Sequence, residues 1–209
     1  MTELAALAGQ DYQLLLADPA WAFRTFNGKN RTPTQKAFRE AEDHYATMPV
    51  EEMCALPVAP IAAKNALLAM WVVGSHIPDA FQLAFAWGFP TCVTDLFYWA
   101  KQKLVQRDQI DLFTGDIPEP RMSMGYHSRK QLEPCLLFSR GKGLPVHAHD
   151  VRQLIVAPSI GHSRKPAAQY DRLERLYGDV KRIELFARNT RAGWDCWGNE
   201  VGKFDEVTA

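Results

Sequence analysis

The segment Leu14-Leu15-Leu16-Ala17-Asp18-Pro19-Ala20-Trp21 joins an apolar run directly to a short polar turn. An apolar run without alternation is typical of a strand that is buried on both faces of a sheet. The ionised Asp18 carboxylate only accepts hydrogen bonds, and Pro19 fixes its own φ and so stiffens the turn. The indole of Trp21 offers a large π-face for stacking. Together these side chains favour binding of a flat, amino-bearing base at the end of a buried strand.

Further short apolar runs predict the rest of a sheet. The predicted strands are Tyr12–Leu16, Ala66–Val73, Cys92–Trp99, Cys135–Phe138, Leu154–Val156 and Arg182–Phe186. Two stretches with helical spacing, Pro78–Trp87 and Pro166–Tyr177, end at glycines that suit the end of a helix. This alternation predicts an α/β fold, a mostly parallel doubly wound sheet with helices on both faces. Ligands bind such sheets at the carboxyl ends of the strands, so Asp18 should lie at the ligand-binding edge.

The size and charge of the chain limit its organisation. The 209 residues suit one domain, which we expect to span 1–209. Because 24 basic residues balance 24 acidic ones, contact with a nucleic acid would need a local basic surface. Two segments, 26–45 and 101–127, lack clear periodicity. We expect them to be substrate-facing loops, because long structureless segments in a compact domain are usually functional.

The cysteines and the apolar runs indicate where in the cell the protein is found. The four cysteines have no C-x-x-C spacing, and Cys92 and Cys135 lie in or beside apolar runs, which predicts reduced core thiols of a cytosolic protein. The N-terminus has no signal-peptide pattern, and the longest apolar run is too short to span a bilayer. We therefore expect a cytoplasmic protein. The spacing of His44, His127 and His162 matches no zinc pattern, so we predict no metal site.

Further clusters of polar and aromatic residues follow the turn at Asp18 in a fixed order. They are His44–Met48, Gly125–Arg129 with Glu133, His162–Pro166, Glu184–Arg188, Gly193–Trp194 and Trp197–Glu200. In this order the set resembles the S-adenosylmethionine-dependent adenine-N(6) methyltransferases, the family that includes the messenger-RNA adenosine methyltransferase catalytic subunit and many bacterial and phage members. Its Asp-Pro-Pro-Trp-type motif is present as Asp-Pro-Ala-Trp. The resemblance extends from Tyr12 to Glu200. The catalytic motif comes early in the chain and the residues that would bind the methyl donor come late, which is the order of the permuted beta class of this family.

The resemblance implies a Rossmann-like methyltransferase fold and a role for each matching residue. The implied catalytic residues are Asp18, Pro19 and Trp21. The implied substrate-binding residues are Ala20, Tyr45, Arg129 and Glu133. The implied S-adenosylmethionine-binding residues are Asp18, Ser163, Lys165, Phe186, Arg188, Asn199 and Glu200. The Asp18 carboxylate and the Pro19 carbonyl would accept both N–H bonds of the target amine and so localise its lone pair. Lys165 would bind the methionyl carboxylate of the donor, whose spent form is S-adenosylhomocysteine.

The sequence leaves the polymer and the partners open. The small chain without a separate target-recognition domain favours a bacterial or phage-type enzyme that acts on DNA, by analogy alone. An RNA adenine methyltransferase is the alternative, and so is a non-catalytic, nucleic-acid-binding partner subunit, because Ala20 replaces the family's second proline. A methyltransferase for small molecules or proteins fits Trp21 less well. The residues also leave open a homodimer or an accessory specificity subunit.

Overall fold

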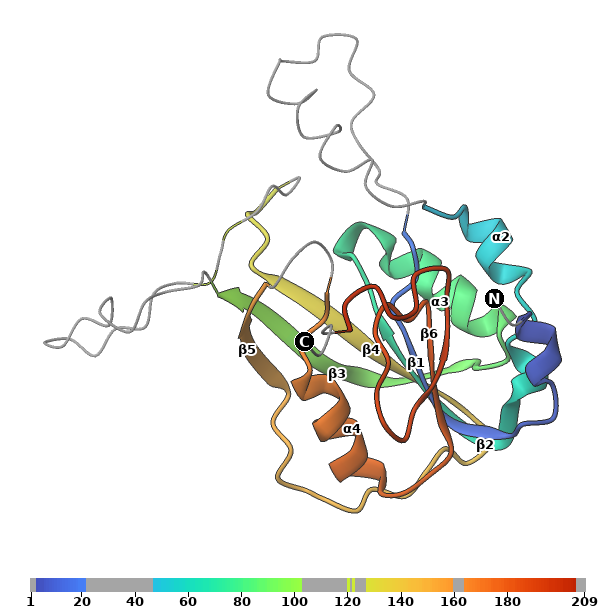
Figure 1. The fold of residues 1–209 in the computed structure, drawn as a ribbon. Coiled ribbons are helices and arrows are strands. Elements are labelled where there is room, and N and C mark those ends of the chain that lie inside the picture. Colours follow the sequence, from blue (N-terminus) through green and yellow to red (C-terminus); the bar gives the residue numbers. More distant parts are fainter. Residues whose placement is uncertain are drawn as a thin grey trace, which may run out of the picture.

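The computed structural model describes residues 3–21, 47–102, 120, 122, 127–159 and 164–205. The strands in this part of the chain are β1 (Tyr12–Ala17), β2 (Ala62–Trp71), β3 (Thr91–Gln102), β4 (Leu132–Arg140), β5 (Leu154–Pro158), β6 (Arg182–Leu185) and β7 (Asp195–Trp197). They form one seven-stranded sheet in the order β5-β3-β4-β2-β1-β6-β7 (Figure 1).

The sheet is parallel except at β4. β1 pairs in parallel with β2 and β6, β6 with β7, and β3 with β5. β4 lies between β2 and β3 and runs antiparallel to both. The prediction of a mostly parallel α/β sheet is therefore confirmed, and the arrangement is consistent with a Rossmann-like methyltransferase fold.

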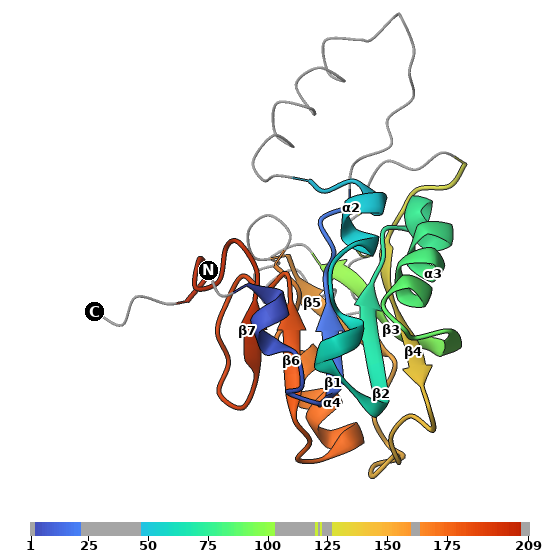
Figure 2. The same ribbon diagram turned by 90° about the vertical axis from the view of Figure 1, so that its right-hand side faces the viewer.

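Helices cover both faces of the sheet. The described helices are the α-helices α2 (Val50–Cys54), α3 (Ile77–Ala86) and α4 (Ala168–Tyr177), with the 3₁₀ turns η1 (Leu4–Leu7), η2 (Ala59–Ile61) and η3 (Gly74–His76). On one face, Leu15 and Leu68 share a core with Leu83 of α3. On the other face, the paired residues Leu14 and Leu67 share a second core with α4. Since both sets of alternating side chains are buried, the strands read as continuous apolar runs. Figure 2 shows α2 and α3 beside each other.

Several details differ from the sequence-based expectations. β7 was not predicted, because a strand of three residues carries too little pattern. α4 begins at Ala168, two residues after Pro166. The expectation of a core thiol at Cys92 is wrong, because the first residues of β3 are exposed, whereas Cys135 in the middle of β4 is buried.

Two expectations concern segments that the structure describes only in part. Segment 26–45 lies outside the described residues. Of segment 101–127, Lys101 and Gln102 belong to β3, and most of the remainder lies outside the described residues. Within the described part of the chain, no helix combines the length and the apolar character needed to cross a membrane.

Candidate active site

The carboxyl edge of the sheet gathers most of the predicted site residues. Asp18 follows β1, Lys101 is close to the end of β3, and Arg188 follows β6. β4 runs in the opposite direction, so its second residue, Glu133, lies at this same edge. Lys165 is in the segment that joins β5 to α4. The edge at which doubly wound sheets bind their ligands is therefore the one that collects these charges.

Lys165 forms the centre of a buried ionic cluster. Its Nζ lies 2.7 Å from Oδ2 of Asp18 and 2.8 Å from Oε1 of Glu133. Only 7% of the Lys165 side chain is exposed, and its Nζ lies 5.7 Å from the centre of the Trp71 ring. Glu133 has a second partner, because its Oε2 lies 2.7 Å from Nζ of Lys101. One buried ammonium thus connects the residue after β1 to the first part of β4.

The two carboxyl groups of this cluster titrate differently. Burial alone would raise the pKa of Glu133, but the charges of Lys165 and Lys101 outweigh burial and lower the pKa to about 2. Burial raises the pKa of Asp18, and the attraction of Lys165 does not fully offset it. Although burial disfavours its charge, Lys165 has a raised pKa because Asp18 and Glu133 face it. Asp18 is therefore the carboxylate in this cluster that can most readily take up a proton.

The turn after β1 is fixed by one hydrogen bond within it and by two to other segments. The Trp21 backbone N–H donates to the Pro19 carbonyl at 2.8 Å, and the Met48 N–H donates to the Ala20 carbonyl at 3.0 Å. The Trp21 indole N–H donates to the Trp71 carbonyl at 3.0 Å. A carbonyl oxygen has two lone pairs, so that of Pro19 keeps one for a further donor. The Asp-Pro-Ala-Trp motif thus forms a closed turn with Ala20 in place of a second proline.

Trp21 is a buried side chain with an aromatic neighbour. It is 5% exposed, and its ring stacks on His76 with centroids 5.3 Å apart and planes inclined by 18°. Nδ1 of His76 lies 2.6 Å from Oδ2 of Asp79, which orients the imidazole. Stacking of a base on Trp21 stays a prediction, and it would have to use the ring face away from His76.

Phe186 has an unusual backbone conformation at the end of β6. Its φ is +60°, a region that aromatic residues rarely adopt and that costs free energy. The ring packs against Trp87 at 6.4 Å and edge-on against Trp197 at 5.6 Å, measured between ring centroids. This strained turn directs the chain toward Arg188, and strain of this kind is concentrated at functional sites.

A close backbone approach joins this turn to the residues after β7. A Cβ atom on Gly198 would lie 2.7 Å from the Ala187 carbonyl oxygen and 2.8 Å from the Ala187 nitrogen. The Ala187 N–H donates to the Trp197 carbonyl at 3.0 Å, and Nε of Arg188 lies 3.5 Å from Oε2 of Glu200. Glycine is thus required at 198 to keep Arg188 and Glu200 together.

A cavity of about 630 Å³ adjoins Gly198. Its lining includes Gln10, Tyr12, Trp197, Gly198 and Asn199. The indole Nε1 of Trp197 is buried and has no hydrogen-bond partner among the described residues. A buried donor without a partner is costly, and an acceptor on a ligand would satisfy it. The cavity, this free indole N–H and the exposed Asn199 amide fit the adenosine half of S-adenosylmethionine.

The sequence analysis named Glu184 at the start of an ordered cluster but gave it no role, and the structure places it next to Asp18 and Lys165. Its side chain is buried, and the Tyr170 hydroxyl donates to its Oε2 at 2.8 Å. Burial raises the pKa of Glu184 to about 7, and the charge of Asp18 adds to that effect. A lone glutamate in the apolar run of β6 is the signal that could have identified it.

The remaining predicted residues are less closely joined to the cluster. Arg129 and Asn199 are exposed, and Arg129 lies before β4. Tyr45 and Ser163 lie outside the described residues. In the described ranges there is no group of three or more His, Cys, Asp or Glu side chains that could hold a metal ion.

Comparison with known proteins identifies relatives over almost the whole chain. A type II methyltransferase, M.MunI from Mycoplasma sp., is 31% identical over 205 residues, covering 93% of this chain and 80% of M.MunI. The N6-methyladenosine RNA methyltransferase MTA1 of Cryphonectria parasitica is 29% identical, covering 93% of this chain and 53% of MTA1. The human N(6)-adenine-specific methyltransferase METTL4 is 26% identical, covering 94% of this chain and 39% of METTL4.

This chain therefore spans about half or less of the two eukaryotic relatives, but most of M.MunI. The MT-A70 family model matches residues 12–200, which begin with β1 and end at Glu200. This range agrees with the range of the resemblance in the sequence, and the prediction of the family is confirmed. The chain belongs to the MT-A70 family, the S-adenosylmethionine-dependent adenine-N(6) methyltransferases.

Proposed function

We propose that this chain transfers a methyl group from S-adenosylmethionine to the exocyclic amine of adenine in DNA. The observation that carries the proposal is the ionic cluster at the carboxyl edge, where Asp18 meets Lys165 beside the closed Asp-Pro-Ala-Trp turn. Membership of the family supports the reaction, and similarity to a type II methyltransferase over 80% of its length supports the choice of DNA.

The donor side would use residues from three segments. When bound, S-adenosylmethionine supplies an electrophilic methyl group on a sulfonium sulfur. Lys165, which stays protonated, would bind the methionyl carboxylate. Arg188 and Glu200 would contact the ribose hydroxyls, and the cavity at Trp197 would hold the adenine ring. Ser163 would add a contact before Lys165.

The acceptor side would depend on the turn after β1. The Asp18 carboxylate and the free lone pair of the Pro19 carbonyl would accept the two N–H bonds of the adenine amine. These acceptors favour a pyramidal nitrogen and stabilise the positive charge that grows on it during attack. Because burial raises its pKa, the Asp18 carboxyl also suits taking the proton that the amine releases.

Positioning supplies most of the remaining catalysis. Trp21, and Tyr45 from the segment outside the described residues, would hold the adenine ring at the turn. Arg129, exposed before β4, would contact the substrate backbone. Adenine within a duplex cannot reach this edge, so the substrate would be single-stranded or the base would be flipped out. RNA is the alternative substrate, because a relative of the same family is an RNA methyltransferase.

The test offers labelled S-adenosylmethionine with single-stranded DNA, duplex DNA and RNA, each made with adenine and with adenine replaced by a purine that lacks the amine. We expect label in an adenine-containing DNA and none in its matched control. Label in RNA alone would overturn the choice of DNA. Donor binding without transfer to any polymer would overturn the reaction.

A further inference from the structure

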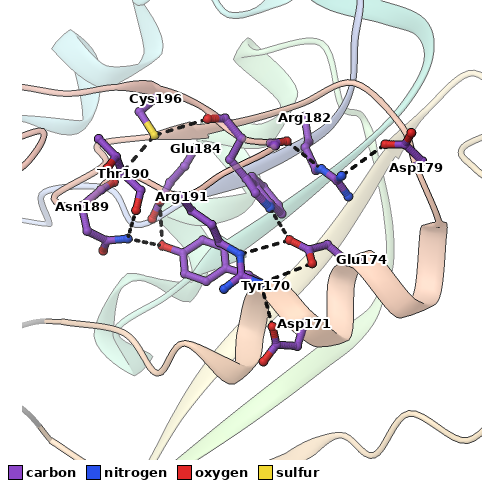
Figure 3. Close-up of polar contacts among 12 residues, drawn as sticks. Tyr170, Asp171, Glu174, Asp179, Arg182, Glu184, Asn189, Thr190, Arg191 and Cys196 are labelled. Atoms are coloured by element: carbon purple, nitrogen blue, oxygen red, sulfur yellow. Dashed lines mark hydrogen bonds and ion pairs between the residues drawn. The ribbon is translucent and has the colours of Figure 1, made fainter. Parts of the chain in front are cut away.

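Apart from Lys165 and Ser163, the residues proposed to bind S-adenosylmethionine belong to one segment, 186–205, which we call the donor loop. It carries Phe186 and Arg188 after β6 and Asn199 and Glu200 after β7. The loop contains only the three-residue strand β7, so its shape depends on what anchors it. Figure 3 shows that many of these anchors come from one helix, α4.

Glu174 of α4 is the shared acceptor for two residues of the donor loop. The Trp194 indole N–H donates to its Oε1 at 2.7 Å. Nε of Arg191 donates to Oε1 at 3.1 Å, and Nη2 of Arg191 donates to Oε2 at 3.2 Å. The guanidinium therefore meets the carboxylate in the two-point geometry that fixes direction as well as distance. Its partners lower the pKa of Glu174 even though burial acts to raise it, so the group is a carboxylate at neutral pH.

Aromatic contacts hold the same two loop residues on α4. The Arg191 guanidinium carbon lies 4.9 Å from the centre of the Tyr170 ring, and the rings of Tyr170 and Trp194 meet edge-on at 5.4 Å. The Asn189 amide donates to the Tyr170 hydroxyl at 3.3 Å (Figure 3). Trp194 is 6% exposed, so its indole N–H needs the protein acceptor that Glu174 provides.

The anchored residues connect directly to the donor contacts. Arg191 is three residues from Arg188, whose carbonyl accepts the Phe204 N–H at 3.1 Å. Thr190 closes the far end, because its N–H and hydroxyl donate to the two carboxylate oxygens of Asp205 at 2.7 and 2.8 Å. A shift of Arg191 would therefore move both the Arg188 side and the Phe204 side of the loop.

The same helix is joined to the ammonium side of the site. α4 begins three residues after Lys165 in the chain. Its Gln169 accepts the indole N–H of Trp71 at 2.6 Å, and that indole ring lies beneath the Lys165 ammonium. α4 thus connects the carboxylate-binding side of the proposed donor site to its ribose-binding side.

We propose that Glu174 is a positioning residue that sets the donor loop at the spacing from Lys165 that S-adenosylmethionine requires. It makes no contact with the donor itself and acts through Arg191 and Trp194. The inference rests on the proposed function, because it takes the donor to bridge Lys165 and the loop. It extends that function because it makes the affinity for S-adenosylmethionine depend on α4, a helix that contacts none of the reacting groups.

The conservative variant separates this role from simple packing. Glu174→Gln keeps an oxygen for the Trp194 N–H but loses one of the two carboxylate charges that pair with Arg191. The other is Asp171 of α4, whose Oδ1 accepts from Nη2 of Arg191 at 2.6 Å and stays in place in both variants. Glu174→Ala loses the oxygen as well as the charge and leaves the Trp194 N–H without its acceptor. We expect the dissociation constant for S-adenosylmethionine to rise about tenfold in the alanine variant and roughly threefold in the glutamine variant.

The test is calorimetric titration of the full chain with S-adenosylmethionine, together with steady-state kinetics. The donor KM should rise with its dissociation constant, while kcat at saturating donor and the affinity for an adenine oligonucleotide change less than about twofold. The control is Asp150→Ala, which breaks an exposed ion pair with Arg175 on the same helix and should leave donor affinity unchanged.

Two outcomes would overturn the positioning role. Either donor affinity stays unchanged in both variants while the melting temperature falls, or donor and oligonucleotide affinities fall together. If the alanine variant does not fold, the glutamine variant decides between these results. Absence of donor binding by the unaltered protein would instead refute the proposed function on which the inference rests.

Discussion

Replacing Glu133 by glutamine should remove a large, pH-dependent part of the stability of this protein. The pKa of Glu133 falls from an ordinary 4.5 to about 2, because Lys165 and Lys101 outweigh the burial that raises it. At about 1.4 kcal/mol per pKa unit, ionised Glu133 contributes about 3 kcal/mol to folding at neutral pH. Glutamine keeps one acceptor for an ammonium, so we expect Glu133→Gln to cost about 2–3 kcal/mol at pH 7.

The sign of the pH dependence follows from the lowered pKa. Stability from such a carboxylate is fully present above the unfolded pKa of 4.5 and is lost as pH falls toward 2. The difference in stability between the original protein and Glu133→Gln should thus shrink by about 1.4 kcal/mol, to about 1 kcal/mol, between pH 7 and pH 3.5. Urea unfolding at both pH values measures it, with Glu52→Gln, an exposed glutamate of α2, as the matched control. A cost under about 0.5 kcal/mol at pH 7, equal to that of the control, would refute the reasoning.

Three further substitutions test other parts of the site. Asp18→Asn should abolish methyl transfer and leave calorimetric donor binding within about threefold, and retained transfer would contradict the role of the carboxylate. Gly198→Ala should destabilise the fold by about 2 kcal/mol in urea unfolding, because its Cβ would meet the Ala187 backbone at 2.7 Å, and an unchanged midpoint would contradict that contact. Because its pKa is raised to about 7, ionisation of Glu184 is unfavourable in the folded state, and the original protein should lose about 3 kcal/mol of stability between pH 4.5 and 7. Glu184→Gln should remove this loss. A stability difference between the original protein and the variant that does not depend on pH would refute the prediction.

The fold was largely predictable because its strands are buried on both faces. Continuous runs such as Tyr12–Leu16 needed no partner information to be recognised as strands. β7 was not predictable, because it is held by pairing with β6 and carries little pattern of its own. The exposed start of β3 at Cys92 shows the same limit, since an apolar run does not say where a strand leaves the core.

The sequence predicted which residues belong to the site, but it predicted few of the contacts between them. Asp18 and Lys165, 147 residues apart, meet at 2.7 Å, which agrees with their assignment to one site. Sequence could not show that Glu133 pairs with Lys165, because β4 enters the sheet antiparallel. The buried packing of Trp21 on His76 likewise depends on η3, a short turn without a sequence signal strong enough to predict it.

The most direct test of the account identifies the methylated atom. The protein and its Asp18→Asn variant are incubated with S-adenosylmethionine and adenine-containing DNA, and the DNA is digested to nucleosides that are separated and weighed by mass spectrometry. We predict N6-methyldeoxyadenosine as the methylated nucleoside from the unaltered protein and none from the variant. A methyl group on another base or on a ring nitrogen, or equal yield from the variant, would contradict the account.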